Sequence, residues 1–350
     1  MNFFEEKLKA IQPLNKGTMK LAKERLDILI KPLDSLGKLE DICIQMAGIY
    51  EDQYFDTSKK LILGFAADHG VYEEGVSPCK QEITKLQFPN FAKGGNGVAS
   101  ISKFIGADVW AIDVGINCKE ELKGVIDRKI RMGTSNMKKG PAMTREEAIQ
   151  SLEVGIEQVK KAKDMGYKLI GIGEMGICNT TPSTAIMSVL CDFEPKDITG
   201  MGCGLDNEGI IRKTKVIEDS IEINKPNKED AIDVLAKVGG FEIGAMAGAI
   251  IGGAIYKLPI VLDGFISYAS ALIAYNLNSL TKEYMIASHL SAERASKGIL
   301  DKLNLSPVLN LDMKLGEGSG AALAFNIIEA ANFTYKNMLT FDDSTMENTH

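Results

Sequence analysis

The sequence predicts an α/β fold: a doubly wound, mainly parallel sheet with helices on both faces, plus a small helical lobe from the N- and C-terminal segments. Short apolar runs alternate with longer amphipathic runs along most of the chain. The short runs are apolar on both faces and end near Gly, Asp or Ser. Strands of a parallel sheet are buried on both faces, and alternating strands and helices produce such sheets.

Residues 1–30 carry only helical signal. One face of this segment is apolar at helical spacing, through Met19, Ala22, Leu26 and Leu29. We expect it to pack with residues 330–350 as the small lobe, which leaves residues 31–329 for the large α/β domain. The strands of that domain are predicted at Leu61–Ala66, Val109–Val114, Lys168–Ile172, Pro259–Leu262 and Tyr284–Ala287.

Helix signals lie between these strands. Thr144 and Glu147 form a capping-box pattern, and Pro226 opens a second helix that runs through Val238. Further on, glycine recurs every four residues, at Gly240, Gly244, Gly248 and Gly252. A glycine inside a helix costs roughly 1 kcal/mol relative to Ala, so we expect the later glycines to permit close packing. The opening Gly240, at the turn before this helix, is instead a candidate to face a ligand.

Composition excludes several classes of protein. The formal net charge is −7, and no run of Lys and Arg offers a nucleic-acid-binding surface. The most apolar stretch, Ile243–Ile255, is too short to span a bilayer, so membrane insertion is not expected. Six cysteines without a Cys-x-x-Cys pair, and only three histidines, make a metal site unexpected. Unpaired thiols and the lack of a secretory signal pattern in Met1–Lys7 favour a cytoplasmic protein.

One carboxylate, Glu317, stands between Gly316 and Gly318, ahead of the helix-like run Ala321–Ala331. Glycines let the backbone turn sharply and approach a ligand closely. Glu317 is therefore a candidate to point into a cleft at the end of a parallel sheet. The alternative is that it caps or charges the first turn of the following helix, where negative charge is favourable.

Two glycine-rich loops suggest a phosphate-bearing ligand. Gly171–Gly176 follows a predicted strand and has the letters of a dinucleotide fingerprint, which alone are a weak signal. The next segment, Asn179–Pro182, suits an anion site at a helix start. The second loop, Thr199–Asp206, is followed closely by Lys213, and backbone N–H groups with a lysine commonly hold phosphate. A tight turn without a ligand is the alternative for either loop.

Polar residues also follow three of the predicted strands. Asp68 and Asp263 place carboxylates at the carboxyl edge of the sheet. His69 is a candidate general base, although a hydrogen-bonded structural histidine is favoured. Ser291 follows the last strand, where it would either cap a helix that begins there or contact a phosphate.

The motifs occur together in a fixed order. They are Lys31–Glu40, Asp68–Val71 with Glu74–Ser77, Gly173–Thr181, Val261–Ile266 and the Glu317 loop. On these motifs the chain resembles the nicotinate-nucleotide:dimethylbenzimidazole phosphoribosyltransferase family, from about residue 17 to about residue 330. The resemblance implies transfer of the 5-phosphoribosyl group of nicotinate mononucleotide to a benzimidazole-type base. The products would be α-ribazole phosphate and nicotinate, formed during assembly of the cobalamin nucleotide loop.

The resemblance also implies a homodimer that needs no cofactor or metal, and it assigns roles to particular residues. Glu317 would be the general base. The residues implied around the nucleotide and its phosphate are Glu174, Gly176, Asn179, Thr180, Gly202, Lys213, Asp263 and Ser291. The residues expected in the acceptor-base pocket are Cys79, Gln87, Met175 and Leu315.

Two other functions stay open from the sequence. The GxGxxG letters at residue 171 leave a nicotinamide-dinucleotide-binding oxidoreductase as an alternative. Asn179–Pro182 disfavours it, because this segment interrupts the place where a fingerprint helix should already be running. A non-catalytic partner subunit of the same fold is the other alternative, and the intact Glu317 disfavours it.

Overall fold

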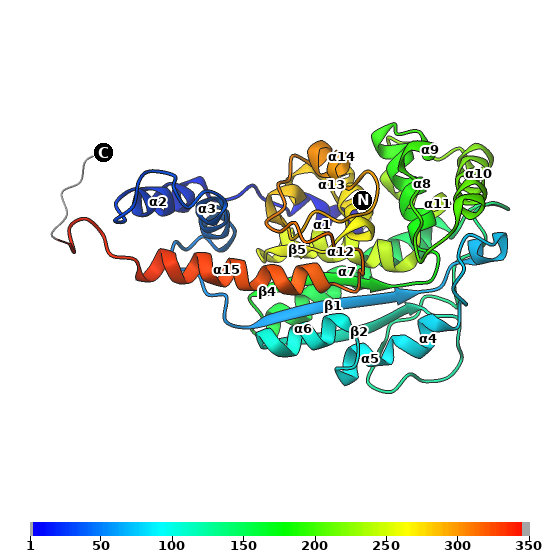
Figure 1. Ribbon diagram of the computed structural model, residues 1–350, viewed down its shortest axis with the longest axis horizontal. Helices are drawn as coiled ribbons and strands as arrows, with labels where there is room; N and C mark the ends of the chain where they lie inside the picture. The colour runs from blue at the N-terminus through cyan, green and yellow to red at the C-terminus, as the bar shows by residue number, and fades with distance from the viewer. Residues whose placement is uncertain (1–2, 345–350) are drawn as a thin grey trace.

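The computed structural model describes residues 3–344, which are organised around one six-stranded sheet (Figure 1). The strand order is β3-β2-β1-β4-β5-β6, and every neighbouring pair is parallel. The strands are β1 (Lys60–Ala67), β2 (Ala107–Gly115), β3 (Ile126–Asp127), β4 (Leu169–Met175), β5 (Ile260–Leu262) and β6 (Met285–Ala287). The predicted parallel sheet is confirmed.

Helices connect the strands and cover both faces of the sheet. In chain order they are α1 (Phe3–Lys9), α2 (Lys16–Asp27), α3 (Lys38–Tyr50), α4 (Ile83–Gln87), α5 (Pro89–Lys93), α6 (Gly97–Ile105), α7 (Arg145–Asp164), α8 (Thr180–Cys191), α9 (Pro195–Ile198), α10 (Asn207–Asn224), α11 (Ala231–Val238), α12 (Phe241–Tyr256), α13 (Phe265–Leu277), α14 (Ser296–Leu303) and α15 (Ser319–Asn337). Short 3₁₀ helices, η1 (Gly70–Glu74) and η2 (Ser279–Tyr284), complete the set.

The two faces of the sheet bury separate hydrophobic clusters. On one face, α12 packs across β1, β2 and β4, with α7 and α13 against it. On the other face, α15 packs on β4, β5 and β1, while α5 and α6 cover β2. Figure 1 shows α15 running along the sheet on the side that also holds α6. Because both faces are covered, the strands are apolar throughout, as the doubly wound prediction required.

The glycine stripe of α12 is a packing surface. A Cβ atom added at Gly244 would overlap the Ser151 hydroxyl of α7, and one added at Gly248 would overlap the Leu152 carbonyl. The two helix backbones are therefore in direct contact, which confirms the packing role of the later glycines. Gly240 lies against His69, since an added Cβ would overlap its ring, so its expected role beside a ligand is not supported.

This contact predicts a stability effect. Gly248→Ala should lower the free energy of unfolding by about 1–3 kcal/mol, because a methyl group cannot enter the α7–α12 contact without separating the helices. Gly140→Ala is the matched control, since a Cβ at Gly140 would meet nothing within 4 Å. Urea unfolding of both variants measures the difference. Equal stability of the two would contradict the close contact.

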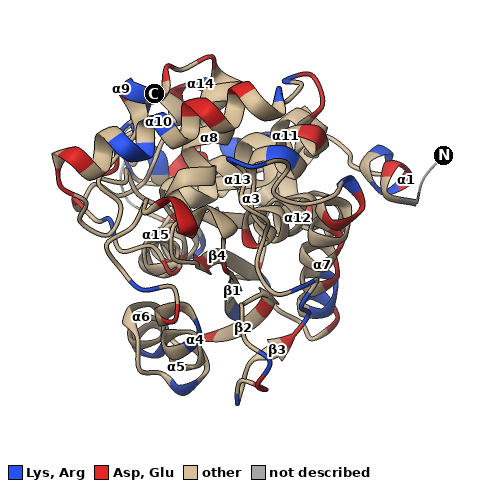
Figure 2. Cartoon of the chain, turned by 90° about the vertical axis from the view of Figure 1, so that its right-hand side faces the viewer, with Lys and Arg blue, Asp and Glu red and all other residues tan. Residues whose placement is uncertain are grey.

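The sheet has a switch point at its centre. β1 has β2 on one side and β4 on the other, so the connections that leave β1 and β4 diverge and open a crevice at the carboxyl edge. Figure 2 looks onto this edge, with the strand ends near the middle and acidic and basic residues interspersed over the surrounding helices. Polar residues at the ends of β4 and β5 therefore face a common space.

The segment from α2 to Leu29 lies beside the segment that follows α15. α2 packs on α3, and Leu29 pairs with Thr340 in an antiparallel bridge. Figure 1 shows α2 and α3 near the far end of α15. Residues 345–350 of the expected lobe lie outside the described residues, and its boundaries at residues 30 and 330 stay a prediction. Within residues 3–344, every helix is either too short or too polar to cross a bilayer.

The five predicted strands are confirmed within a few residues, but some boundaries were wrong. The edge strand β3 was missed. The helix predicted from Pro226 begins at Ala231, because the Asp230 carboxylate caps it by accepting hydrogen bonds from the backbone N–H groups of Ile232 and Asp233, each at 3.1 Å. The helix expected directly after β6 begins only at Ser296.

Candidate active site

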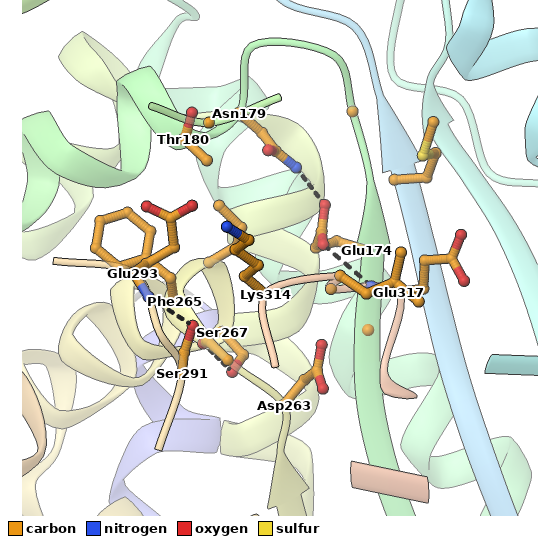
Figure 3. Close-up of a pocket in the computed structure, with 18 of the residues that line it drawn as sticks. Glu174, Asn179, Thr180, Asp263, Phe265, Ser267, Ser291, Glu293, Lys314 and Glu317 are labelled. Atoms are coloured by element: carbon orange, nitrogen blue, oxygen red, sulfur yellow. Dashed lines mark hydrogen bonds between the residues drawn. The ribbon is translucent and has the colours of Figure 1, made fainter. Parts of the chain in front are cut away.

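A cavity of about 310 Å³ opens at the carboxyl edge of the sheet, beyond β4, β5 and β6 (Figure 3). Its walls come from the end of β4 and the turn after it, the 199–206 loop, the start of α13, the loop after β6 and the loop before α15, with Met246 contributed by α12. In Figure 3, Glu317 lies at one end beyond Glu174, while Thr180, Phe265, Ser291 and Glu293 surround the other end. Chain segments that are distant in sequence therefore build one site.

The Glu317 side chain is held by α6, which is distant from it in the sequence. Its backbone takes the left-handed conformation, with φ 65°. The carboxylate Oε2 accepts a hydrogen bond from the backbone N–H of Val98 at 3.1 Å, in the first turn of α6. The positive end of α6 thus meets the Glu317 charge. Capping of the following helix, the alternative role for Glu317, is wrong for this structure.

Asp263 is the residue that caps α15. Its carboxylate accepts backbone hydrogen bonds from Gly318 at 3.0 Å and from Gly320 at 2.7 Å. Burial raises the pKa of Asp263 to about 7, against the opposing effect of these backbone donors. Asp263 lies in the cavity wall, yet its clearest action is to fix the loop that carries Glu317.

Glu174, at the end of β4, connects the two sides of the cavity. One oxygen accepts a hydrogen bond from the Asn179 side chain, and the other accepts one from the backbone N–H of Glu317 at 3.4 Å (Figure 3). Burial raises the pKa of Glu174 to about 8, with added repulsion from Asp263 and opposition from Asn179. This shift favours the protonated form of Glu174, and that form limits repulsion among the carboxyl groups of the site.

A buried lysine lies beneath the glycine-rich loop at residues 199–206. Lys213 is 1% exposed, and its Nζ donates to the Thr180 hydroxyl at 2.8 Å and to the Gly200 carbonyl at 3.3 Å. Burial lowers the pKa of Lys213 to about 8, while the nearby Glu293 carboxylate opposes this shift. A Cβ atom added at Gly202 would stand 3.4 Å from Nζ, so the loop packs directly on this cation.

Most predicted site residues share the cavity. Those in its lining are Glu174, Met175, Gly176, Asn179, Thr180, Gly202, Asp263, Ser291, Leu315 and Glu317. Lys213 lies behind the lining and reaches it through Thr180. Cys79 and Gln87 do not join the lining: the Cys79 N–H donates to the Ser77 hydroxyl at 3.1 Å, and the exposed Gln87 accepts from Asn90 at 3.1 Å.

The structure also shows the surroundings of His69 and Ser291. His69 is 1% exposed, and its Nε2 hydrogen-bonds the Glu242 carboxylate at 2.7 Å, which supports a structural role. Burial opposes protonation, but Glu242 together with Asp68 and Glu174 outweighs it and raises the pKa of His69. Ser291 lines the cavity, and its hydroxyl accepts from the Glu293 N–H at 3.3 Å without capping a helix.

Sequence reasoning missed several residues of the cavity wall. They include Met246, Phe265, Ser267, His289, Glu293 and Lys314. Glu293 and Lys314 lie within three residues of Ser291 and Glu317, so proximity to those motifs was an available signal. Met246 lies in α12, and the sequence of that helix predicts only a packing role for its apolar residues. In the part of the chain that the structure describes, no group of three or more His, Cys, Asp or Glu side chains is placed to hold a metal ion.

The geometry separates two chemical functions. Around Thr180, Gly202 and Ser291 the cavity offers hydroxyl groups and backbone with a buried cation behind them, which suits a phosphate. Around Leu315 and Met175 the wall is apolar, and Glu317 offers a hydrogen-bond acceptor there. An aromatic ring that must lose a proton fits that end.

Comparisons with known proteins show the family of the chain. A family model described as a phosphoribosyltransferase matches residues 11–346. A protein of Clostridioides difficile (strain 630), named nicotinate-nucleotide–dimethylbenzimidazole phosphoribosyltransferase, is 61% identical over 99% of both chains. A protein of the same name from Clostridium acetobutylicum is 48% identical, over 98% of this chain and 97% of that one.

A solved structure is similar as well. The crystal structure of the enzyme of that name from Thermus thermophilus superposes with a TM-score of 0.90 at 34% identity, covering 96% of this chain and 100% of that chain. These comparisons give no support to the dinucleotide oxidoreductase alternative. The chain belongs to the nicotinate-nucleotide–dimethylbenzimidazole phosphoribosyltransferase family.

Proposed function

We propose that this enzyme transfers the 5-phosphoribosyl group of nicotinate mononucleotide to a benzimidazole-type base, giving α-ribazole phosphate and nicotinate for the cobalamin nucleotide loop. The observation that carries the proposal is the position of Glu317, held by the first turn of α6 at the apolar end of a cavity whose other end suits a phosphate. The names of the close relatives support the same reaction.

The proposed chemistry needs one base. Nicotinate departs from a pyridinium, so its ring nitrogen becomes neutral on leaving and needs no proton. The acceptor nitrogen gains positive charge as it attacks C1′ of the ribose, and the other ring nitrogen must then lose its proton. A carboxylate at Glu317 would stabilise the developing charge and accept that proton. Attack opposite to the leaving group converts the β anomer to the α anomer.

The phosphate would occupy the opposite end. We infer that Thr180, Gly202 and Ser291 contact it and that Lys213 supplies the positive charge from behind Thr180. Gly176 and Asn179 would shape the turn that borders the ribose. The support for this arrangement is that Lys213 is buried, protonated below about pH 8 and hydrogen-bonded to a cavity residue.

The acceptor ring would lie against Met175 and Leu315. Met175 is a flexible, polarizable side chain that adapts to rings of different shape, and Leu315 is 60% exposed at the opening. Cys79 and Gln87 stay predictions for this pocket, and they lie outside the cavity lining in the described structure.

This arrangement predicts broad use of acceptor bases. Unsubstituted and substituted benzimidazoles should all react, and bases that differ by one methyl group should be distinguished by roughly 1–3 kcal/mol at most. Competition assays with paired bases measure the ratio of kcat/KM values. A preference of several thousandfold for one base over its nearest analogue would contradict an adaptable apolar wall.

We also propose a cytoplasmic homodimer. Support for the compartment comes from the six free cysteines, since thiols persist in reducing surroundings. Support for a subunit contact comes from large apolar side chains that are exposed, including Leu86, Leu311 and Leu315, the last of which lines the cavity. Sedimentation of the purified protein measures the number of subunits.

The proposed reaction is tested by mixing purified protein with nicotinate mononucleotide and dimethylbenzimidazole and following nicotinate by chromatography. We expect nicotinate release that depends on the added base. Thermal stabilisation by nicotinate mononucleotide, and not by NAD, should accompany it. Stabilisation by NAD alone, with no nicotinate release, would favour a dinucleotide-binding protein instead.

A further inference from the structure

Two cysteines from separate chain segments lie beside one hydroxyl group at the rim of the cavity. The Ser77 hydroxyl is 3.9 Å from the Cys203 sulfur, and it accepts the backbone N–H of Cys79 at 3.1 Å. The pKa of the Cys203 thiol is raised in part by Cys79, as expected for neighbouring groups. The shared hydroxyl therefore brings Cys79 and Cys203 to one place.

The two thiols differ in accessibility. Cys203 is exposed and belongs to the cavity lining, and Cys79 is partly buried. The proposed transfer reaction uses neither sulfur atom. An exposed cysteine with a second cysteine beside the same hydroxyl group has the arrangement of a pair in which one thiol reacts first and the other resolves the mixed disulfide.

We propose that Cys79 and Cys203 are a modification site, a thiol pair that a low-molecular-weight disulfide converts into a disulfide bond that weakens nucleotide binding. The Cys203 thiolate attacks one sulfur of the small disulfide, which releases one small thiolate and leaves a mixed disulfide on Cys203. The Cys79 thiolate then attacks the Cys203 sulfur and releases the second small thiol. Two protein thiols are oxidised and one small disulfide is reduced to two thiols.

The bond would disturb the phosphate end of the cavity. A disulfide requires a sulfur–sulfur distance of about 2.05 Å, which is shorter than any contact between unbonded thiols, so Cys203 must move toward Cys79. The neighbouring Gly202 and Gly204 have φ of 53° and 108°, and these residues form a loop without regular structure. Gly202 packs over Thr180 and Lys213. Displacement of this loop would therefore move the Gly202 backbone away from the place where we propose that the phosphate binds.

The rate of the modification should depend on pH. Although the Cys203 residue as a whole is exposed, partial burial of its sulfur raises the pKa of the thiol, and the neighbouring Cys79 raises it further. The reactive thiolate is therefore scarce at neutral pH. Formation of the disulfide should accelerate as the pH rises from 7 to 9.

The test uses the full chain, first reduced with dithiothreitol and then incubated with excess oxidised glutathione. Free thiols are alkylated, and mass spectrometry of the digest identifies any peptide that joins Cys79 to Cys203. Calorimetry measures the affinity for nicotinate mononucleotide before and after oxidation. We expect the joined peptide, an affinity that is at least tenfold weaker, and full recovery with dithiothreitol.

Variants separate the pair from the other cysteines. Cys79→Ser should stop at a mixed disulfide on Cys203, and Cys203→Ser should form no joined peptide. Cys118→Ser is the matched control, since its hydroxyl preserves the hydrogen bond to the Glu120 carbonyl and it should respond to oxidation as the parent does.

Absence of the joined peptide from the oxidised parent would overturn the proposal, as would its presence with unchanged affinity for nicotinate mononucleotide. The joined peptide is detected without substrate or turnover. A chain that forms it but releases no nicotinate would therefore contradict the proposed transfer reaction and leave the thiol pair standing.

Discussion

Glu317→Gln should lower kcat by 10²-fold or more, the usual contribution of a positioned proton acceptor. The amide keeps the shape of the side chain, and its oxygen can still accept the Val98 N–H that holds the carboxylate in place. What it loses is the negative charge and the ability to take a proton from the acceptor base. Steady-state kinetics with nicotinate mononucleotide and dimethylbenzimidazole measure the loss.

The matched control is Glu146→Gln, which changes an exposed carboxylate in the first turn of α7 in the same isosteric way. It should retain the parent rate. Equal unfolding midpoints for the two variants would show that the Glu317 substitution acts on chemistry and leaves the fold intact. Unchanged kcat in Glu317→Gln would remove the general-base role.

Lys213→Ala should raise KM for nicotinate mononucleotide by roughly 10²-fold, with a smaller effect on kcat. Attraction between the Lys213 ammonium and the phosphate acts in both the ground state and the transition state, so its loss weakens binding more than it slows the bound complex. The same substitution removes the charge-assisted hydrogen bond to the Thr180 hydroxyl, a kind of bond that contributes about 1.5–3 kcal/mol. Initial-rate measurements over a wide range of nucleotide concentration separate the two constants.

Lys215→Ala is the control on the same helix, because Lys215 is exposed and pairs with Asp219 at 2.9 Å. It should behave as the parent. A Lys213 variant with normal nucleotide affinity would show that the buried ammonium does not act on the phosphate.

The lowered pKa of Lys213 also predicts how kcat/KM for the nucleotide depends on pH. Below about pH 8 the ammonium is charged and can attract the phosphate, and above that value it loses its proton. The ratio kcat/KM reports groups of the free enzyme, so it should fall on the alkaline side with an apparent pKa near 8. That alkaline limb should disappear in Lys213→Ala. A limb that persists unchanged in the variant would assign it to another group.

Much of the fold could be predicted because buried parallel strands have a strong signal. Runs such as Leu61–Ala66 are apolar on both faces and end at polar residues, so their position and burial could be read directly. β3 is only Ile126–Asp127 at the edge of the sheet, too short for any pattern. The start of α11 was misplaced since Pro226 and Asp230 both suit a helix start, and only the hydrogen bonds of Asp230 decide between them.

The site was predictable where it follows the strand ends. Glu174 and Asp263 directly follow or end neighbouring strands, and the carboxyl ends of parallel strands meet at one edge. Phe265 and Met246 reach the cavity from helices, so their position depends on how those helices pack. Cys79 stays a prediction for the acceptor pocket; its N–H donates to the Ser77 hydroxyl, and no local pattern in the sequence determines the path of its loop.

The most direct test of the account is the identity and configuration of the product. Nuclear magnetic resonance of the purified product, with nicotinate quantified in the same reaction, reports both the anomer and the stoichiometry. We expect one nicotinate released for each α-ribazole phosphate formed, as attack on the face opposite to the leaving group requires. A β-configured product, or nicotinate accompanied by free ribose 5-phosphate in place of a new glycosidic bond, would contradict the account.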